Sequence, residues 1–592
     1  MSLQDFLYTY FKNVVVFDFE YSQTPGNNPN PVCCTFRELK TGKQITHWYL
    51  SEVHDWPFKD EDTIYICHNA VAEVSCMLEL GLKVPLHIWD SFVQEKKLYN
   101  GKELGFSLLK CCARYGIKTI SEIQKNVYRD VIIDNFPTYT AKQKEKIIDY
   151  NITDVAENAQ LFLAQLAKYE SQDKNFKRTI SQALFHGRAM GVCAAIERNG
   201  IPINYELYCD MEKYFPAIKA QEIAELSKVA DIYVGDKWNQ KKFEKFLEKE
   251  NLLKNWPRTK TGQPAQDDKT LYRNSAANPK IQQIRDSKFI IGAKNLKGYC
   301  VGKDKMSRAP LKMFGQITGR TNVSTAINPF GAPRRMRNMI GTSKDKIIAY
   351  ADWKSQEAVI QAALSQDPNV IEAISSRDVY IYTGQVAKAI PPGNWTKEDY
   401  PVERELYKQT FLATAYGQTA FGLKAKLNCS ESKATYLLSK LHFAFPTYFK
   451  WISELIKFAA ARGYLETKFG WKYFMSDIEF TNPRRLMNWP LQSHGSEILR
   501  RAMIDLYDSG YEISMPVHDA LLIHMDRKGC AKKLKKLKTI MSAAAEKVIG
   551  MSIPVDIKII RKGFSQDKEH QLRWDALYQK LLIAKECTDN GR

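Results

Sequence analysis

The length of the chain is the feature that most constrains its fold. A single hydrophobic core stops growing at roughly 250–300 residues, and this chain has 592. We therefore expect several domains, each with a core of its own. No apolar run approaches the ~18–20 residues that a membrane-spanning helix needs, so we expect no membrane association.

The twelve cysteines argue for a reducing compartment. None stands at CxxC spacing, so a structural zinc site is not expected, and a disulfide framework is not expected in so large a chain. The N-terminus has the pattern of neither a signal peptide nor an Arg-rich transit peptide, and it leads almost directly into a strand-like run. These features predict a cytoplasmic location.

The charge balance is strongly basic. The net charge is +20, from 86 Lys and Arg residues against 66 Asp and Glu residues. Such an excess suggests a polyanionic partner, although a well-solvated basic surface explains the charge equally well. Lysines are crowded into residues 237–262.

Apolar runs and helical patterns alternate in a way that predicts mixed α and β structure. Residues 13–165 read as an α/β unit that begins with the strand VVVFDF (14–19). Helical periodicity over 178–199 stops at Gly200, as helices commonly do. Residues 205–300 are expected to be helical and basic. The other expected elements are strands at 63–69, 346–352 and 511–525, a helix within 144–169 and a helical C-terminal tail.

A pair of carboxylates ends the first expected strand. Asp18 and Glu20 are two residues apart, so both side chains point to one face of the strand. Neighbouring carboxylates repel each other unless a cation or proton lies between them, which makes the pair a natural divalent-metal site. Two solvated acids at a strand exit are the alternative for the pair taken alone.

Two later segments each add an acid at a spacing of four residues. They are NAVAE, from Asn69 to Glu73, and YNITD, from Tyr150 to Asp154. Tyr150 and Asp154 lie one turn apart on one helical face. With DFE, the pattern resembles the proofreading exonuclease domain of the DNA polymerase I family, whose motifs read DxE, NxxxD and YxxxD in this order.

A second pair of acids lies in the C-terminal half. The run IIAYAD (347–352) is apolar up to Asp352, and MPVHDALLIHM (515–525) reads as two short strands that meet at His518-Asp519. Side by side in a sheet, the strand end and the hairpin turn would offer Asp352 and Asp519 to one metal pair. Taken singly, each is equally explained as an unrelated turn aspartate.

Between these acids, a cationic stripe follows one face of an expected helix. Arg404, Lys408, Leu412 and Tyr416 recur every four residues and therefore share a face. Arg and Lys supply charge for phosphates, and the Tyr ring supplies a stacking face, so the stripe suggests a triphosphate clamp. An amphipathic helix with solvated Arg and Lys is the alternative.

The order of these segments resembles polymerase motifs A, B and C of the DNA polymerase I family. Motif A corresponds to Asp352 through Glu357, motif B to Arg404 through Gly417, and motif C to His518-Asp519. Three further segments match the family: TGRTN (318–322), GYLETKFGWKYF (463–474) and RRLMNWPLQSHGSEILRRAM (484–503). The resemblance covers about residues 13–565.

The resemblance implies an α/β and α+β multidomain fold. A ribonuclease H-like 3′→5′ exonuclease domain (residues 1–170) would precede a right-hand polymerase domain (171–592). Within the polymerase domain, the thumb would take about 200–310, the fingers about 368–445, and the palm about 311–367 and 446–592.

The resemblance also implies roles for individual exonuclease residues. Asp18, Glu20 and Asp154 would bind two Mg²⁺ ions that activate water and stabilise the leaving 3′ oxygen. Tyr150 would orient the attacking water, Glu73 would complete the catalytic set, and Asn69 would contact DNA.

For the polymerase domain, the resemblance implies a second pair of Mg²⁺ ions. Asp352, Asp519 and the backbone carbonyl of Trp353 would bind them, and Mn²⁺ would serve as a substitute in both sites. The implied dNTP-binding residues are Arg404, Lys408, Leu412, Tyr416, Glu357 and Tyr380. The implied DNA-binding residues are Arg320, Arg484, Asn488, Gln492 and His518.

Four positions depart from the family pattern. Glu73 stands where the family usually has Asp, and Ala520 takes the place of an acid in motif C. Leu412 replaces an aromatic residue and Tyr380 a histidine, both of which are phage-like features. With no 5′ nuclease domain before the exonuclease, the resemblance implies a phage-type enzyme of viral DNA replication in the host-cell cytoplasm, with replisome proteins as candidate partners.

The implied function is template-directed DNA synthesis from dNTPs on primer–template DNA, with 3′→5′ proofreading. A single-subunit phage-type RNA polymerase shares the central pattern, but the proofreading motifs and Glu357, at the sugar-gate position, argue against it. A DNA exonuclease whose polymerase half only binds duplex is supported by Ala520 alone. A non-enzymatic DNA-binding protein would have no reason to hold both sets of carboxylates.

Overall fold

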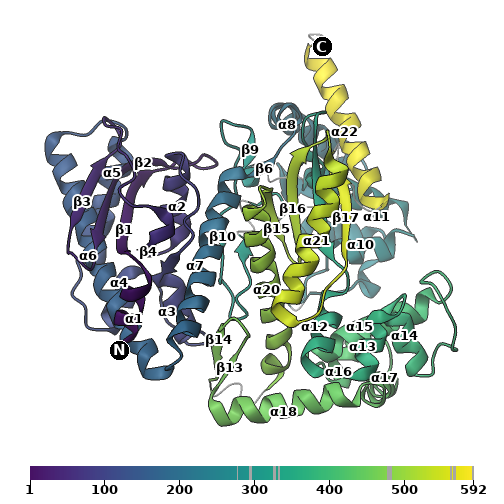
Figure 1. The fold of residues 1–592 in the computed structure, drawn as a ribbon. Helices are drawn as coiled ribbons and strands as arrows, with labels where there is room; N and C mark the ends of the chain where they lie inside the picture. The colour runs from purple at the N-terminus through teal and green to yellow at the C-terminus, as the bar shows by residue number, and fades with distance from the viewer. Residues whose placement is uncertain are drawn as a thin grey trace. The chain divides into compact units, whose positions relative to one another are not determined.

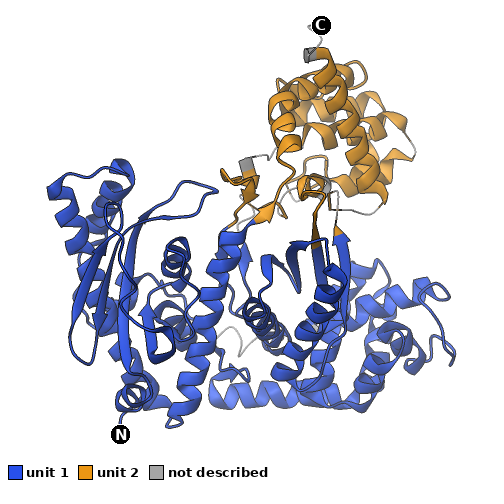
Figure 2. Ribbon diagram, turned by 45° about the horizontal axis from the view of Figure 1, so that its top comes forward, with its two compact units in different colours: residues 1–200, 310–323, 349–559 blue, residues 201–309, 324–348, 560–592 orange. Residues whose placement is uncertain are grey.

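The structure is a computed structural model of the chain (Figure 1). It describes residues 1–259, 261–276, 278–292, 297–323, 328–330, 334–476, 483–560, 563–564 and 568–589. The chain forms two compact units, which are described separately below (Figure 2). Unit 1 comprises residues 1–200, 310–323 and 349–559, and unit 2 comprises 201–309, 324–348 and 560–592.

Unit 1 begins with a five-stranded sheet in the order β3-β2-β1-β4-β5. The central strand β1 (Asn13–Ser22) pairs antiparallel with β2 (Asn30–Glu38), which pairs antiparallel with β3 (Gln44–Trp48). On its other side β1 pairs parallel with β4 (Thr63–Cys67), and β4 with β5 (Ile88–Asp90). The strands expected at 14–19 and 63–69 are confirmed.

Helices complete this N-terminal module. The long α6 (Ala141–Gln172) packs on β1 and β2, which confirms the helix expected within 144–169. The other helices are α1 (Leu3–Tyr10), α2 (Ala70–Glu79), α3 (Ser91–Tyr99), α4 (Leu108–Arg114) and α5 (Glu122–Asn135). A short 3-10 turn, η1 (Asp60–Asp62), precedes β4.

Helix α1 is not among the elements expected from the sequence, which predicts that the N-terminus leads almost directly into the first strand. Its N-terminus is a capping box, in which the Ser2 hydroxyl accepts from the Asp5 N–H at 3.0 Å and Asp5 accepts from the Ser2 N–H at 2.9 Å. Leu3 and Leu7 are buried in the same core as Val14 and Phe162. The signal for this helix was present in the sequence as Ser-x-x-Asp.

Helix α7 (Phe176–Asn199) runs between the N-terminal sheet and a second sheet of unit 1 (Figure 1). It contacts α2 and β5 on one side and β15 and α20 on the other. Gly200 ends it at φ 66°, which confirms the expected end of the helix.

The second sheet has four strands in the order β15-β16-β12-β17. These are β12 (Lys346–Trp353), β15 (Glu512–Val517), β16 (Ala520–Asp526) and β17 (Val555–Ile560). The predicted strand at 346–352 is confirmed, as is the hairpin that turns at His518-Asp519. The helices α20 (Arg484–Asp508) and α21 (Cys530–Ile549) pack against each other beside it. The Trp353 indole donates to the Met541 carbonyl of α21 at 3.0 Å. Asp352, next along the strand, therefore points to the opposite face.

A group of short helices follows β12 and has its own core around Tyr407, Phe411 and Leu441. The helices are α12 (Gln356–Ser365), α13 (Pro368–Ser375), α14 (Val379–Val386), α15 (Pro401–Ala415), α16 (Ala420–Leu427), α17 (Glu431–Ala444) and α18 (Pro446–Arg462). Unit 1 also contains the two-stranded pairs β10 (Leu311–Lys312) with β11 (Asn322–Val323), and β13 (Tyr464–Glu466) with β14 (Lys472–Phe474).

Unit 2 is mainly helical, as expected for residues 205–300. Its helices are α8 (Tyr205–Ser227), α9 (Gln240–Lys249), α10 (Asp268–Ser275), α11 (Pro279–Ile291) and α22 (Lys568–Asp589), with the 3-10 turns η2 (Leu253–Asn255), η3 (Lys297–Tyr299) and η4 (Arg334–Met339). Its short strands pair as β6 (Ile201–Pro202) with β9 (Met306–Ser307) and β7 (Tyr233–Val234) with β8 (Lys237–Trp238). The helical tail α22 is attached by ion pairs, including Lys580 with Glu222 at 2.6 Å.

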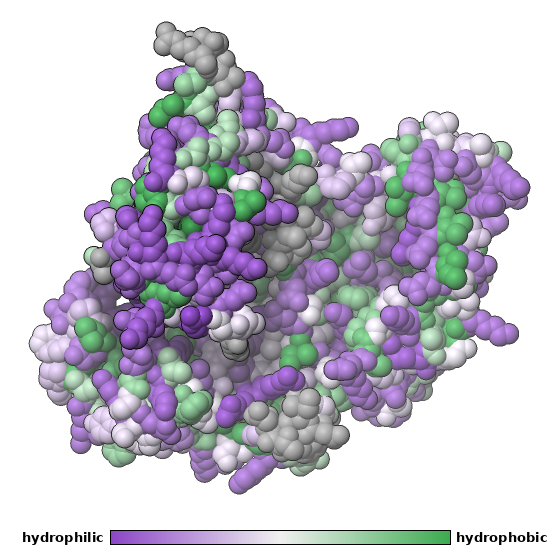
Figure 3. Space-filling view, turned by 180° about the vertical axis from the view of Figure 1, so that it is seen from behind, coloured by the Kyte–Doolittle hydropathy of each residue, from purple (hydrophilic) through white to green (hydrophobic). Residues whose placement is uncertain are grey.

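Hydrophilic side chains predominate on the face drawn in Figure 3, and the hydrophobic ones form small separate groups. Among the helices of the described residues, none has both the length and the apolar character required to cross a bilayer.

Gly187 makes the contact between α7 and β5 possible. A Cβ at this position would lie 1.9 Å from the Ile88 carbonyl oxygen, which is backbone and cannot move aside cheaply. We predict that Gly187→Ala lowers the free energy of unfolding by about 3 kcal/mol, because α7 must shift away from the strand. Gly422→Ala on α16 is the control, since its nearest new contact is 3.5 Å away. Urea unfolding of both variants measures the difference, and equal stability would contradict this account of the packing.

Candidate active sites

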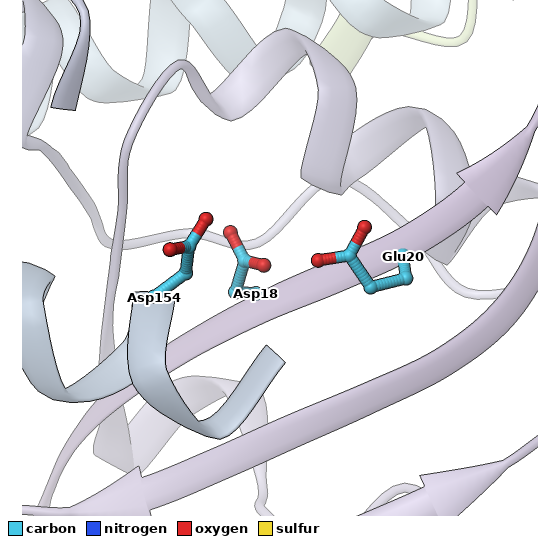
Figure 4. Close-up of side chains that lie close together, drawn as sticks. All are labelled: Asp18, Glu20 and Asp154. Atoms are coloured by element: carbon cyan, nitrogen blue, oxygen red, sulfur yellow. The ribbon is translucent and has the colours of Figure 1, made fainter. Parts of the chain in front are cut away.

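Three carboxylates meet at the edge of the N-terminal sheet. Asp18 and Glu20 extend from β1 and Asp154 from α6, and one oxygen of each lies within 4.8 Å of the others (Figure 4). Glu20 and Asp154 are buried, and Asp18 is half-buried. The expected same-face placement of Asp18 and Glu20 is thus confirmed, and α6 brings Asp154 to them.

Burial and mutual repulsion make this cluster a candidate cation site. Burial is the main cause that raises the pKa of Asp18 well above its ordinary value, and the charge of Asp154 adds to it. Burial also raises the pKa of Glu20, followed by the charge of Asp18. Three oxygen donors that resist joint ionisation fit a hard divalent cation such as Mg²⁺ or Mn²⁺.

A cavity of about 510 Å³ opens onto the cluster. Tyr150 and Asn69, both predicted site residues, line it. Tyr150 is 3% exposed, its ring stacks on Tyr128 at 5.0 Å, and burial raises the pKa of its phenol. Asn69 adopts φ 72° at the start of α2, where its N–H donates to the Asp90 carboxylate at 3.2 Å.

Glu73 also lines the cavity, but it does not belong to the 4.8 Å group of described carboxylates. Its side chain accepts a hydrogen bond from the Phe19 N–H at 2.6 Å. Burial raises the pKa of Glu73, with a further contribution from Asp18. The Glu73 carboxylate is therefore bound to the backbone of β1 at Phe19, the residue between Asp18 and Glu20 in the chain.

Sequence reasoning missed two residues that hold this cluster in place. Lys125 of α5 is 5% exposed, and its Nζ lies 2.6 Å from Asp154 and 3.2 Å from Glu157. Asn151 donates to the Asp18 carboxylate at 2.9 Å and to its carbonyl at 3.0 Å. Asn151 stands inside the YNITD motif and could have been noticed there, whereas no motif marks Lys125.

The second pair of predicted acids also comes together. Asp352 is the last residue but one of β12, and Asp519 lies in the turn before the neighbouring strand β16. Burial, then the charges of Asp519 and Asp556, raise the pKa of Asp352 to about 6. Arg320 pairs with Asp519 at 2.7 Å. Asp556, on β17, was not predicted, and it pairs with Lys354 at 3.0 Å.

Glu357, Tyr416 and Gln492 form a hydrogen-bonded group near these acids. Gln492 donates to the Glu357 carboxylate at 2.6 Å and to the Tyr416 hydroxyl at 3.2 Å, and Tyr416 donates to Glu357 at 3.3 Å. Asn488 hydrogen-bonds to Tyr416 as well. Burial, followed by the charge of Asp519, raises the pKa of Glu357. Four of the predicted residues therefore share one surface.

The residues of the cationic stripe of motif B lie along one helix and at its end. Arg404, Lys408 and Leu412 lie on α15, but the helix ends at Ala415 and Tyr416 caps it with φ −92°. The chain turns immediately after Tyr416, at Gly417 (φ 60°). From this position the Tyr416 hydroxyl reaches Glu357.

The remaining predicted residues lie around this surface. Arg404 donates to Asp378 at 2.7 Å, and its guanidinium lies 5.3 Å from the centroid of the Tyr380 ring. Lys408 is 3.6 Å from Glu405 on the same helix. His518 and Arg484 are exposed, Leu412 is half-buried, and Ala520 is fully buried at the start of β16.

The carboxylate cluster of the N-terminal module predicts a metal-dependent stability. Because folding raises the pKa of Asp18 and Glu20, the metal-free protein should lose stability as pH rises from their unfolded values of about 4 through their folded values. Adding Mg²⁺ at pH 8 should stabilise the wild type by about 2.7 kcal/mol at a hundred times the dissociation constant. Asp18→Asn should be more stable than the wild type without metal, and its stabilisation by Mg²⁺ should be smaller by the contribution of this cluster.

Calorimetry with and without Mg²⁺ measures both effects. Asp62→Asn, which removes an exposed carboxylate near β4, is the control and should respond as the wild type does. An undiminished Mg²⁺ response in Asp18→Asn would mean that the metal binds elsewhere.

Comparisons with known proteins agree with the C-terminal motifs. The model of the family described as DNA polymerase family A matches residues 217–562. DNA polymerase I of Rhizobium leguminosarum is 24% identical over 412 residues, which cover 64% of this chain and 39% of that protein. DNA polymerase theta of Drosophila melanogaster is 26% identical over 254 residues, which cover 38% of this chain and 12% of that protein. The chain thus spans well under half the length of these relatives.

A solved structure shares the fold. It is the POL domain of Pol1 from M. smegmatis in complex with DNA primer-template and dNTP, with a TM-score of 0.72 and 18% sequence identity. The match covers 95% of this chain and 98% of that chain. Since the family model matches more than half of the sequence, this chain belongs to DNA polymerase family A.

Proposed function

We propose that this chain extends DNA primers on a template from dNTPs and removes 3′-terminal nucleotides at a separate site. The single observation that carries the proposal is the presence of two distinct carboxylate sites in a member of DNA polymerase family A. One lies on β1 and α6, and the other on β12 and the β15–β16 turn. Two sites allow synthesis and excision to act on one DNA end in turn.

In the polymerase site, acidic residues would bind the metal ions and arginines would bind the phosphates of the substrate. Asp352, Asp519 and the carbonyl of Trp353 would hold two divalent ions, which neutralise developing charge and lower the pKa of the primer 3′-OH. Arg320 forms an ion pair with Asp519, and Arg404 forms one with Asp378. Each arginine can exchange its carboxylate for a phosphate, which is the same kind of bidentate oxygen partner.

The base and sugar of the incoming nucleotide would contact the hydrogen-bonded group. Tyr416 supplies a ring face, and Lys408 adds charge for the triphosphate. Leu412 lies one turn before Tyr416 on α15, and Tyr380 lies on α14. Gln492, Asn488, Arg484 and His518 would contact primer or template. Glu357 is held by Gln492 and Tyr416, so its carboxylate is fixed where a 2′-OH would otherwise fit.

In the N-terminal site, Asp18, Glu20 and Asp154 would hold two divalent ions that activate water and stabilise the leaving 3′ oxygen. Tyr150 lines the cavity and would orient the attacking water. Glu73 supports β1 through the Phe19 N–H, and Asn69 would contact the strand. Support for this role comes from the 4.8 Å spacing of the three acids and from the order of the motifs.

These assignments extend to the domains and to the biological setting. We assign residues 1–170 to a ribonuclease H-like exonuclease domain and 171–592 to the polymerase domain, with the thumb, palm and fingers as bounded above. Leu412 and Tyr380 favour a phage-type enzyme of viral DNA replication. A second candidate is a 3′→5′ exonuclease with a catalytically weak polymerase half, which Ala520 alone favours.

Separate sites predict separable activities. Asp519→Asn should lower primer extension by at least ~10³-fold, about 4 kcal/mol, because an amide does not supply the charge that holds the ions. The same variant should still shorten a 3′ end in Mg²⁺. Asp18→Ala should do the reverse, with excision lost and extension retained.

Extension with dNTPs and shortening without them are the two assays. Near wild-type extension by Asp519→Asn would place the palm metals elsewhere. Loss of both activities in either variant, with the fold intact, would contradict two independent sites. Extension below detection in the wild type would favour the second candidate function.

Sugar selection should depend on Glu357. Its removal opens the space that a 2′-OH needs, so Glu357→Ala should lower the dNTP-to-rNTP ratio of kcat/KM by roughly tenfold or more. Glu454→Ala, an exposed carboxylate on α18, is the control. The ratio separates selection from any general loss of rate caused by freeing Gln492 and Tyr416. An unchanged ratio would rule out the gate.

A further inference from the structure

Helix α5 forms one wall of the N-terminal cavity and was marked by no motif. Its residues at helical spacing face the cavity: Glu122, Lys125, Asn126, Arg129, Ile132 and Ile133. Positions three and four apart lie on one face of a helix, so this is a continuous side of α5. The wall therefore presents two cations, an amide and, at the start of α5, the carboxylate of Glu122 to a space that ends at the carboxylate cluster.

The two cations on this wall differ in their partners. Lys125 is buried and committed to Asp154 and Glu157. Arg129 is exposed, and within the described residues it has neither a hydrogen bond nor an ion pair. Asn126 is exposed and likewise has no hydrogen-bond partner among the residues that the structure describes. Lys125 therefore stabilises the site itself, while Arg129 and Asn126 remain available to a ligand.

Arg129 interacts electrostatically with the acids of the cluster, but it forms no ion pair with them. Its charge lowers the pKa of Asp18, Glu20 and Tyr150 against the larger effect of burial. Because Arg129 lines the same cavity as the carboxylate cluster, one ligand can contact both the guanidinium and the bound metal ions. A phosphodiester is such a ligand, because one oxygen can face the metals while another accepts from a guanidinium.

The rest of the cavity suits a nucleotide. Its volume of about 510 Å³ lies within the roughly 300–1,000 Å³ of small-ligand sites. Leu108 and Leu109, from the start of α4, provide apolar contacts on its lining. Sites for single strands combine a cationic track for the backbone with an apolar surface for bases. The cavity contains both.

We propose that Arg129 and Asn126 on α5 bind a backbone phosphate of single-stranded DNA whose 3′ end enters this cavity. The inference rests on the proposed exonuclease function and specifies its substrate subsite. Arg129 donates to the phosphate together with the Asn126 amide, and the terminal base lies against Leu108 and Leu109. Arg129 acts as a binding residue, and Lys125 as a positioning residue for Asp154.

The test is equilibrium binding of a short single-stranded oligonucleotide to the full chain, with Ca²⁺ in place of Mg²⁺ and the oligonucleotide checked for integrity. Each of its last three linkages is replaced in turn by a neutral methylphosphonate. In the wild type, one replacement should weaken binding roughly tenfold, the loss expected for one charge-assisted hydrogen bond. Arg129→Gln should bind the unmodified oligonucleotide roughly tenfold more weakly and should be insensitive to that same replacement.

Two further variants make the result specific. Arg129→Lys keeps the charge and should retain sensitivity to the methylphosphonate. Lys142→Gln removes one exposed charge from α6, outside the lining of the cavity, and should behave as the wild type. Thermal unfolding of each variant checks that the fold is intact. If Arg129→Gln remained as sensitive to the replacement as the wild type, Arg129 would only offset the carboxylates and the proposal would be overturned.

Excision in Mg²⁺ separates this inference from the function on which it rests. Arg129→Gln should raise KM for a single-stranded end more than it lowers kcat. A wild type that excises, with no Arg129-dependent phosphate effect, overturns the inference and leaves the exonuclease. A wild type that does not excise removes the exonuclease, and an Arg129-dependent phosphate effect in that protein would still support the binding site.

Discussion

Repulsion between carboxylates held close together is the constraint on which both sites of this protein depend. Asp18, Glu20 and Asp154 lie within 4.8 Å in a largely buried setting, and Asp352 shares its surroundings with Asp519 and Asp556. Such groupings cost stability unless cations offset them. The fold supplies cations for this purpose: Lys125 contacts Asp154, Arg320 contacts Asp519, and Lys354 contacts Asp556.

These counter-cations differ in what they can do next. Lys125 forms ion pairs with two carboxylates and so holds Asp154 in position. Arg320 and Arg404 each contact a single carboxylate at 2.7 Å, and a phosphate can take the place of that partner. Arg129 has no such partner among the described residues. The availability of a cation thus follows from how many acids the fold places around it.

Much of this could be predicted from the sequence, because the deciding patterns were local. Alternation in VVVFDFE fixed the common face of Asp18 and Glu20, and the apolar runs that end at Asp352 and His518-Asp519 indicated strands and a turn. Gly200 marked the end of α7. The helix α1 was missed although its capping box was local too. The four-residue spacing that starts at Arg404 indicated α15, for which Tyr416 is the C-cap residue.

The sequence by itself determined which residues carry charge and which face of a strand or helix each one shares, since these follow from periods of two and 3.6 residues. It did not determine which elements meet. Lys125 reaches Asp154 because α5 packs against α6, and Asp556 approaches Asp352 because β17 pairs beside β12. The pKa values of the acids depend on these contacts between elements, because burial and neighbouring charge result from packing between segments distant in the chain. Only the tertiary structure decided which cations form ion pairs, as Lys125 does, and which have no such partner among the described residues, as is the case for Arg129.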